Sequence, residues 1–66
     1  MQDTTFNAKL KPVTVMIVDD HPALRAGLCS LIESDPALRV LVDVTSGEAA
    51  YAAYRSHRPD TVVMDL

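Results

Sequence analysis

Three aspartates stand where two apolar segments end, and they are the residues of this sequence best suited to chemistry. Asp19 and Asp20 follow the apolar run 13–18, and Asp65 follows the apolar run 61–64. Ligation by oxygen alone favours a hard cation such as Mg²⁺, which is held by one or two carboxylates together with water and phosphate oxygens. A carboxylate can also act as a nucleophile and form an aspartyl-phosphate. The three acids therefore predict Mg²⁺-dependent phosphoryl chemistry, provided that the fold brings them together.

Alternating strand and helix patterns surround these acids. The run 13–18 is β-branched and does not alternate with polar residues, which is typical of a strand buried on both faces of a parallel sheet. Pro22 suits the first position of a helix, and the Ser34-Asp35-Pro36 sequence ends that helix. The remaining expected elements are a strand over 40–44, a helix that starts from a capping-box pattern at 45–48, and a buried strand over 61–64.

The first helix has one apolar face, because Leu24, Leu28, Leu31 and Ile32 recur at the helical period. Gly27 lies in the middle of this helix, where glycine is unfavourable, so we expect it to pack closely against the sheet. Asp43 interrupts the second strand and places that strand towards an edge of the sheet.

The order βαβαβ predicts an α/β fold, the N-terminal half of a flavodoxin-like doubly wound parallel sheet with strand order 2-1-3. The first and third strands are then neighbours about 4.8 Å apart, and the two helices cover opposite faces. Their carboxyl ends lie side by side at the topological switch point, where such sheets bind ligands. Asp19, Asp20 and Asp65 would converge there.

Composition excludes several classes of protein. The chain has 66 residues, a net charge of −3 and one cysteine, Cys29. A single cysteine forms no internal disulfide, and an acidic balance is not the signature of a nucleic-acid or anionic-membrane surface. Residues 1–11 lack periodicity and have no signal-peptide core, so we expect a leader or disordered extension. These features predict a cytoplasmic protein.

Three stretches resemble a bacterial two-component response-regulator receiver domain. They are Val-Met-Ile-Val-Asp-Asp-His-Pro over 15–22, Ala-Leu-Arg-Ala-Gly-Leu over 23–28, and Arg-Pro-Asp-Thr-Val-Val-Met-Asp-Leu over 58–66. The Asp-Asp-His-Pro junction and the following Arg-x-Gly-Leu look most like the NarL/FixJ (LuxR-type) transcriptional branch. The resemblance covers residues 13–66.

The resemblance implies a phosphorelay switch, a stoichiometric phosphoprotein rather than an enzyme. Asp65 would accept a phosphoryl group from a sensor histidine kinase. Asp20 and Asp65 would ligate Mg²⁺ directly, and Asp19 would act through a bound water. DNA would be bound only through a C-terminal domain that lies outside these residues.

The chain departs from the family pattern at its C-terminal end. The family also uses a main-chain carbonyl two residues past the acceptor, a Ser/Thr after the fourth strand and a Lys after the fifth. We therefore expect residues 12–66 to be a truncated receiver domain and a poor phospho-acceptor alone. The third strand would expose an apolar edge, so we expect self-association there.

Other interpretations stay open at this point. The runner-up is a receiver-like protein-interaction module that is not phosphorylated. A Mg²⁺ phosphohydrolase is more distant, because its acids would be spaced Asp-x-Asp and here they are adjacent. Structural or surface roles are expected for the other chemically notable residues: His21, Arg25, Cys29, Tyr51, Tyr54 and His57.

Overall fold

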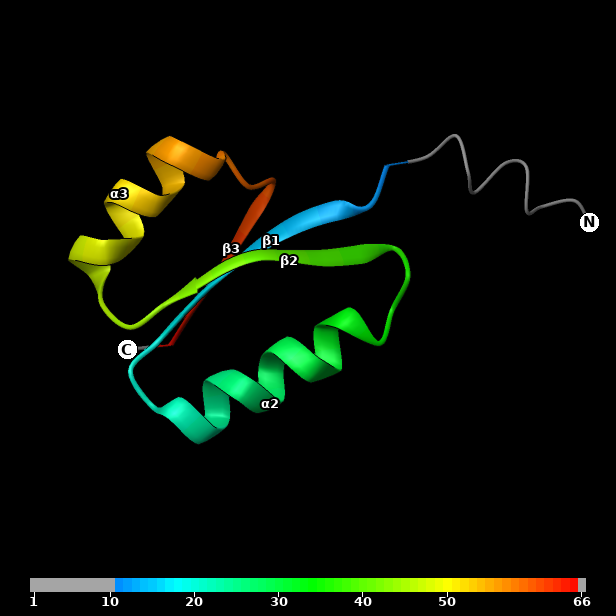
Figure 1. Cartoon of the computed structure of the whole chain (residues 1–66), viewed down its shortest axis with the longest axis horizontal. Helices are drawn as coiled ribbons and strands as arrows, with labels where there is room; N and C mark the ends of the chain where they lie inside the picture. Colours follow the sequence, from blue (N-terminus) through cyan, green and yellow to red (C-terminus); the bar gives the residue numbers. More distant parts are fainter. Residues whose placement is uncertain (1–10, 66) are drawn as a thin grey trace, which may run out of the picture.

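Three parallel strands form one sheet between two helices in the computed structural model, which describes residues 11–65 (Figure 1). The elements are β1 (Val13–Asp19), α2 (Pro22–Glu33), β2 (Leu38–Val44), α3 (Gly47–His57) and β3 (Thr61–Asp65). The strand order is β2-β1-β3, and the helices lie on opposite faces of the sheet, which confirms the predicted topology. The expected leader falls on residues 1–11, and its residues 1–10 lie outside the described part of the chain.

Strand β1 carries the core. Its last five residues, Val15 to Asp19, are all buried, because β1 is the central strand and both helices pack against it. On the α3 face, Met16 and Val18 pack with Ala50, and three half-buried residues complete the cluster: Val42, Val44 and Ala53. The prediction of a strand buried on both faces is confirmed for β1.

Helix α2 begins and ends where the sequence predicts. Pro22 occupies the first turn, and the Ser34 N–H donates to the carbonyl oxygens of Ser30 and Leu31 at the other end. The helix has no fully buried residue, and Leu31 is 69% exposed. The expectation that Gly27 packs closely against the sheet is wrong, since a Cβ there would meet nothing within 4 Å.

Helix α3 is capped one residue later than the sequence predicts. The hydroxyl of Ser46, rather than Thr45, accepts the Ala49 N–H at 3.1 Å. At the other end the helix closes on Arg58, whose φ of 51° is left-handed. Neither described helix combines the length and the apolar character needed to cross a lipid bilayer.

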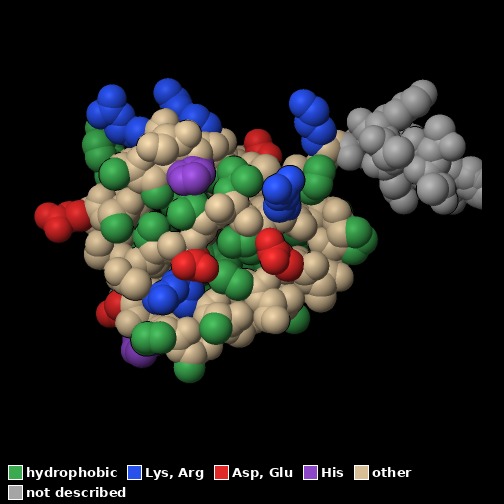
Figure 2. All heavy atoms as spheres, viewed as in Figure 1, with side chains coloured by type: hydrophobic (Ala, Val, Ile, Leu, Met, Phe, Trp, Pro, Cys, Tyr) green, Lys and Arg blue, Asp and Glu red, His purple; other side chains and the backbone are tan. Residues whose placement is uncertain are grey.

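The two edge strands differ from each other in exposure. Strand β2 is half-buried and carries Asp43, which confirms its predicted edge position. Strand β3 was expected to be buried, and this is wrong: all five residues are exposed, because both helices pack against β1 and β2. Between α3 and β3 lies an open apolar groove of about 340 Å³, lined in part by Tyr51, Tyr54 and Met64. On the face shown in Figure 2, charged side chains are interspersed with hydrophobic ones.

Candidate metal centre

The carboxyl ends of β1 and β3 lie side by side. The two strands pair in parallel, and Asp19 is the register partner of Asp65. The predicted backbone juxtaposition of the first and third strands is therefore present. It places two acids from distant parts of the sequence at the switch point of the sheet, the position where such folds bind ligands.

The Asp19 carboxylate is fully buried, and only one of its oxygens is satisfied. Oδ1 accepts a hydrogen bond from the backbone N–H of His21 at 2.7 Å. Oδ2 is buried and has no hydrogen-bond partner among the described residues. A buried acceptor without a partner costs about 1–3 kcal/mol, and more when it is charged. The unpartnered Oδ2 is therefore an observation, independent of any motif, that favours a bound cation.

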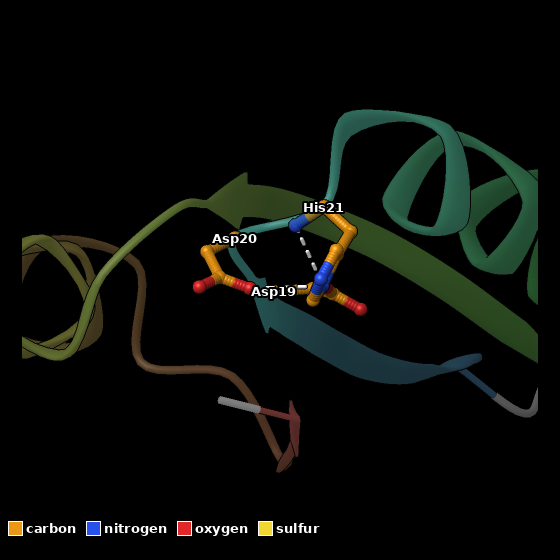
Figure 3. A group of neighbouring side chains, drawn as sticks. All are labelled: Asp19, Asp20 and His21. Atoms are coloured by element: carbon orange, nitrogen blue, oxygen red, sulfur yellow. Dashed lines mark hydrogen bonds and ion pairs between the residues drawn. The ribbon is translucent and has the colours of Figure 1, made fainter.

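Asp20 and His21 complete a compact group with Asp19 (Figure 3). The Nδ1 atom of His21 lies 2.9 Å from Asp20 Oδ1 and 3.3 Å from Asp19 Oδ1. One ligand atom from each residue lies within 4.8 Å of the other two. The imidazole is 72% exposed, as expected, but its contact with both acids was missed. The adjacency of the three residues in the sequence was the available signal.

Asp65 stands apart from this group. Its Cα is paired with that of Asp19, but its side chain is exposed and is not a member of the close group of ligand atoms among the described residues. The structure thus brings Asp19 and Asp20 together and places Asp65 beside them at the level of the backbone. The role of Asp65 as ligand and phospho-acceptor remains a prediction.

The donor set suits a hard divalent cation. Asp19 and Asp20 offer carboxylate oxygens from one buried and one exposed side chain, and Asp20 opens to water. Mg²⁺ prefers such sites because it retains several waters and needs only one or two carboxylates. The residues present therefore fit Mg²⁺, which would reduce the repulsion between these acids and an incoming phosphoryl group.

A second set of contacts lies behind the acids and was missed by sequence reasoning. Arg25 is not the solvated charge that was expected: its side chain is 20% exposed, and Nη1 donates to the Asp19 carbonyl oxygen at 2.9 Å. Its Nε lies 3.5 Å from Asp43 Oδ1. The other oxygen of Asp43 accepts the Cys29 thiol at 3.2 Å. Burial, with smaller contributions from Asp43 and Glu33, raises the pKa of Cys29 from 9.0 to about 11.

A known protein family matches most of this chain. The model of the response regulator receiver domain matches residues 15–66. The chain belongs to the response regulator receiver family. Receiver domains are signalling modules of two-component phosphorelay systems, and the β2-β1-β3 sheet is consistent with their flavodoxin-like fold.

The relatives of this receiver domain include protein-glutamate methylesterases and nitrate/nitrite response regulators. A protein-glutamate methylesterase/protein-glutamine glutaminase of Cereibacter sphaeroides is 42% identical over 62 residues, covering 94% of this chain and 17% of the relative. One from Nitrosospira multiformis is 39% identical over 54 residues, covering 82% of this chain and 15% of the relative. The nitrate/nitrite response regulator protein NarL of Escherichia coli is 36% identical over 56 residues, covering 85% of this chain and 26% of the relative.

The NarL relatives confirm the predicted resemblance to that branch, whereas the methylesterase relatives were not foreseen. This chain spans between 15% and 26% of the length of the three relatives described above. No solved structure matches the chain.

Proposed function

We propose that this receiver domain accepts a phosphoryl group on Asp65 from a sensor histidine kinase, with Mg²⁺ held by Asp19, Asp20 and Asp65. The observation that carries the proposal is the pairing of Asp65 with Asp19, whose buried Oδ2 has no partner among the described residues. In the transfer, the P–N bond of the kinase phosphohistidine breaks and a bond forms between phosphorus and an Asp65 carboxylate oxygen. The kinase imidazole leaves with the P–N electron pair and takes up a proton.

Burial assigns different tasks to the acids. Asp65 is exposed on β3, where a phosphohistidine on another protein can reach it. Asp20 is also exposed and can ligate a cation directly, while Asp19 is fully buried and would act through a bound water, as the family resemblance implies. His21 would give up its 2.9 Å contact with Asp20 when a cation binds.

The output we propose is transcriptional control. The support is the Asp-Asp-His-Pro junction at 19–22, the Arg-x-Gly-Leu at 25–28 and the NarL relatives. DNA binding would belong to a domain outside this chain, and the setting would be cytoplasmic. Phosphorylation would then act as the input signal for that domain.

Phosphorylation by acetyl phosphate, followed by intact mass spectrometry, tests the proposal. We expect the wild-type chain to gain one phosphoryl group in Mg²⁺ and none in EDTA, more slowly than a complete receiver domain treated in parallel. Asp65→Asn should abolish the gain. Asp60→Asn is the matched control. Asp60 lies directly before the first residue of β3, at the opposite end of the strand from Asp65, so this variant should gain the phosphoryl group as the wild type does. Phosphate that remains on the Asp65→Asn variant would refute the assignment.

The second candidate is a receiver-like interaction module that is not phosphorylated. It is favoured by the position of His21, whose imidazole lies against both Asp19 and Asp20, and by the separation of Asp65 from that group. In this case His21, rather than a metal ion, would lie against the two acids. A wild-type chain that neither gains phosphate nor binds Mg²⁺ would support this candidate and overturn the first.

A further inference from the structure

We propose that Arg25 positions the metal-binding acids and that Asp43 holds Arg25 in place for that task. The inference rests on the proposed Mg²⁺ site, and it names two residues outside the site on which the affinity of the site depends. Arg25 belongs to α2 and Asp43 to β2, so the device ties two elements to the end of β1.

The contact with Asp19 is made through its main chain. Arg25 Nη1 donates to the Asp19 carbonyl oxygen at 2.9 Å. That oxygen and the Asp20 nitrogen belong to one planar peptide unit. A bond that fixes the oxygen therefore also fixes the direction in which the chain enters Asp20. Arg25 thus determines where the Asp20 carboxylate is presented without contacting it.

Arg25 is itself held from the other side. Its Nε faces Asp43 Oδ1 at 3.5 Å, and Asp43 Oδ2 accepts the Cys29 thiol at 3.2 Å. Both oxygens of Asp43 are therefore engaged by α2. Asp43 is the register partner of Ile17, two residues before Asp19 in β1, so the ion pair lies beside the strand that carries the acids. A planar guanidinium can make both contacts at once, whereas an ammonium group is a point charge on a flexible stem.

Charge and positioning predict opposite effects of removing Arg25. A cation near a Mg²⁺ site repels the metal, so simple electrostatics predicts that Arg25→Gln binds Mg²⁺ more tightly. If Arg25 fixes the Asp19–Asp20 peptide, the same variant binds more weakly. Residues that orient metal ligands typically change affinity by about 10–100-fold, and the exposed position of Asp20 indicates the lower end, about 10-fold.

Mg²⁺ titrations followed by amide NMR signals of residues 19–21 measure this effect. We expect weaker binding in Arg25→Gln by about 10-fold and partial rescue in Arg25→Lys, which keeps the charge and one donor. Arg55→Gln is the matched control: Arg55 stacks over Tyr51 on α3 at 5.8 Å, and its loss should leave the dissociation constant unchanged. Thermal unfolding of each variant reports whether the fold is kept.

Asp43→Asn tests whether Asp43 holds Arg25 in place. It also tests the positioning role if Arg25→Gln fails to fold. We expect it to weaken Mg²⁺ binding in the wild-type background and to have no further effect in the Arg25→Gln background, because the two residues act through one contact. If the wild-type chain binds Mg²⁺ and Arg25→Gln binds it equally or more tightly, the positioning role is refuted. If the wild-type chain binds no Mg²⁺, the proposed function itself fails, and the role of Arg25 fails with it.

Discussion

Asp19 is fully buried and Asp65 is exposed, although the two residues are register partners on adjacent strands. The difference arises because β1 is the central strand, packed by both helices, while β3 is an edge strand that neither helix covers. One acid is thus withdrawn from solvent. The other stays open, where a phosphoryl donor on another protein can reach it.

The unpartnered oxygen of Asp19 predicts a gain in stability when its charge is removed. Asp19→Asn keeps an oxygen that can accept the His21 N–H and removes a buried charge, so the free energy of unfolding without Mg²⁺ should rise by about 1 kcal/mol. Urea unfolding measures this change. Mg²⁺ should stabilise the wild type and not the variant. A lower unfolding free energy in Asp19→Asn would contradict the prediction, and the exposed Asp20→Asn serves as its control.

Burial predicts a large difference between two aliphatic truncations. Ile17 is fully buried in β1, so Ile17→Ala should cost about 2–5 kcal/mol of unfolding free energy. Leu31 is mostly exposed on α2, so Leu31→Ala should change stability by about 0.5 kcal/mol or less. Chemical denaturation of both variants gives the comparison. Equal losses would mean that the α2 surface is buried in solution.

The Thr14–Asp60 contact predicts acid sensitivity. The Thr14 N–H and hydroxyl both donate to Asp60 Oδ2 at 2.9 Å, and they lower the pKa of Asp60 below its ordinary value of 3.8. Because the folded-state pKa is the lower one, this contribution is fully present above 3.8 and is lost as the pH falls through the folded-state pKa. Unfolding midpoints measured down the acid range should fall less steeply in Asp60→Asn. An identical acid slope in both proteins would exclude this role.

Cys29 is predicted to be an unreactive thiol. Its pKa is raised from 9.0 to about 11, mainly by burial and then by Asp43, so the thiolate fraction near neutral pH is about 100-fold below that of an ordinary cysteine. Alkylation by iodoacetamide should be slow in the folded chain and ordinary in urea. Asp43→Asn should speed alkylation of the folded chain, since it removes the carboxylate that disfavours the thiolate. Rapid wild-type alkylation would disprove the assignment.

The exposed edge of β3 predicts self-association of this chain. Val62, Val63 and Met64 are all exposed, with Met64 at 56%, on a strand that pairs on one side only among the described elements. Such an edge can pair with another chain. Sedimentation velocity should show a larger species as concentration rises, and Met64→Lys should suppress it. A single monomeric boundary at all concentrations would refute the prediction.

Local signals predicted the elements well. The β-branched run before Asp19 and the proline at position 22 fixed the end of β1 and the start of α2, because both act through backbone geometry within a few residues. The order of strands followed from the alternation of strand and helix. Element boundaries and strand order depend on residues that are close together in the sequence, so they can be predicted from one sequence alone.

The errors came from contacts between elements. Gly27 was expected to touch the sheet and does not, and β3 was expected to be covered and is not, because exposure depends on how helices pack. The Arg25–Asp43 pair was missed since the residues are on different elements. The charged residue at position 43, within the otherwise apolar stretch 40–44, was the sequence signal for that pair.

Strand β1 supplies most of the buried residues in the described part of the chain and, at its last residue, the buried acid Asp19. Any substitution that loosens its middle therefore also displaces the end that carries the proposed metal ligand Asp19, and loss of signalling from such a variant would reveal nothing specific about chemistry. Helix α2 does not combine a fully buried core with a site residue in this way, because none of its residues is fully buried. Natural or engineered tuning of the proposed switch without damage to the fold is accordingly open to changes on α2 rather than at the buried residues 15–19 of β1.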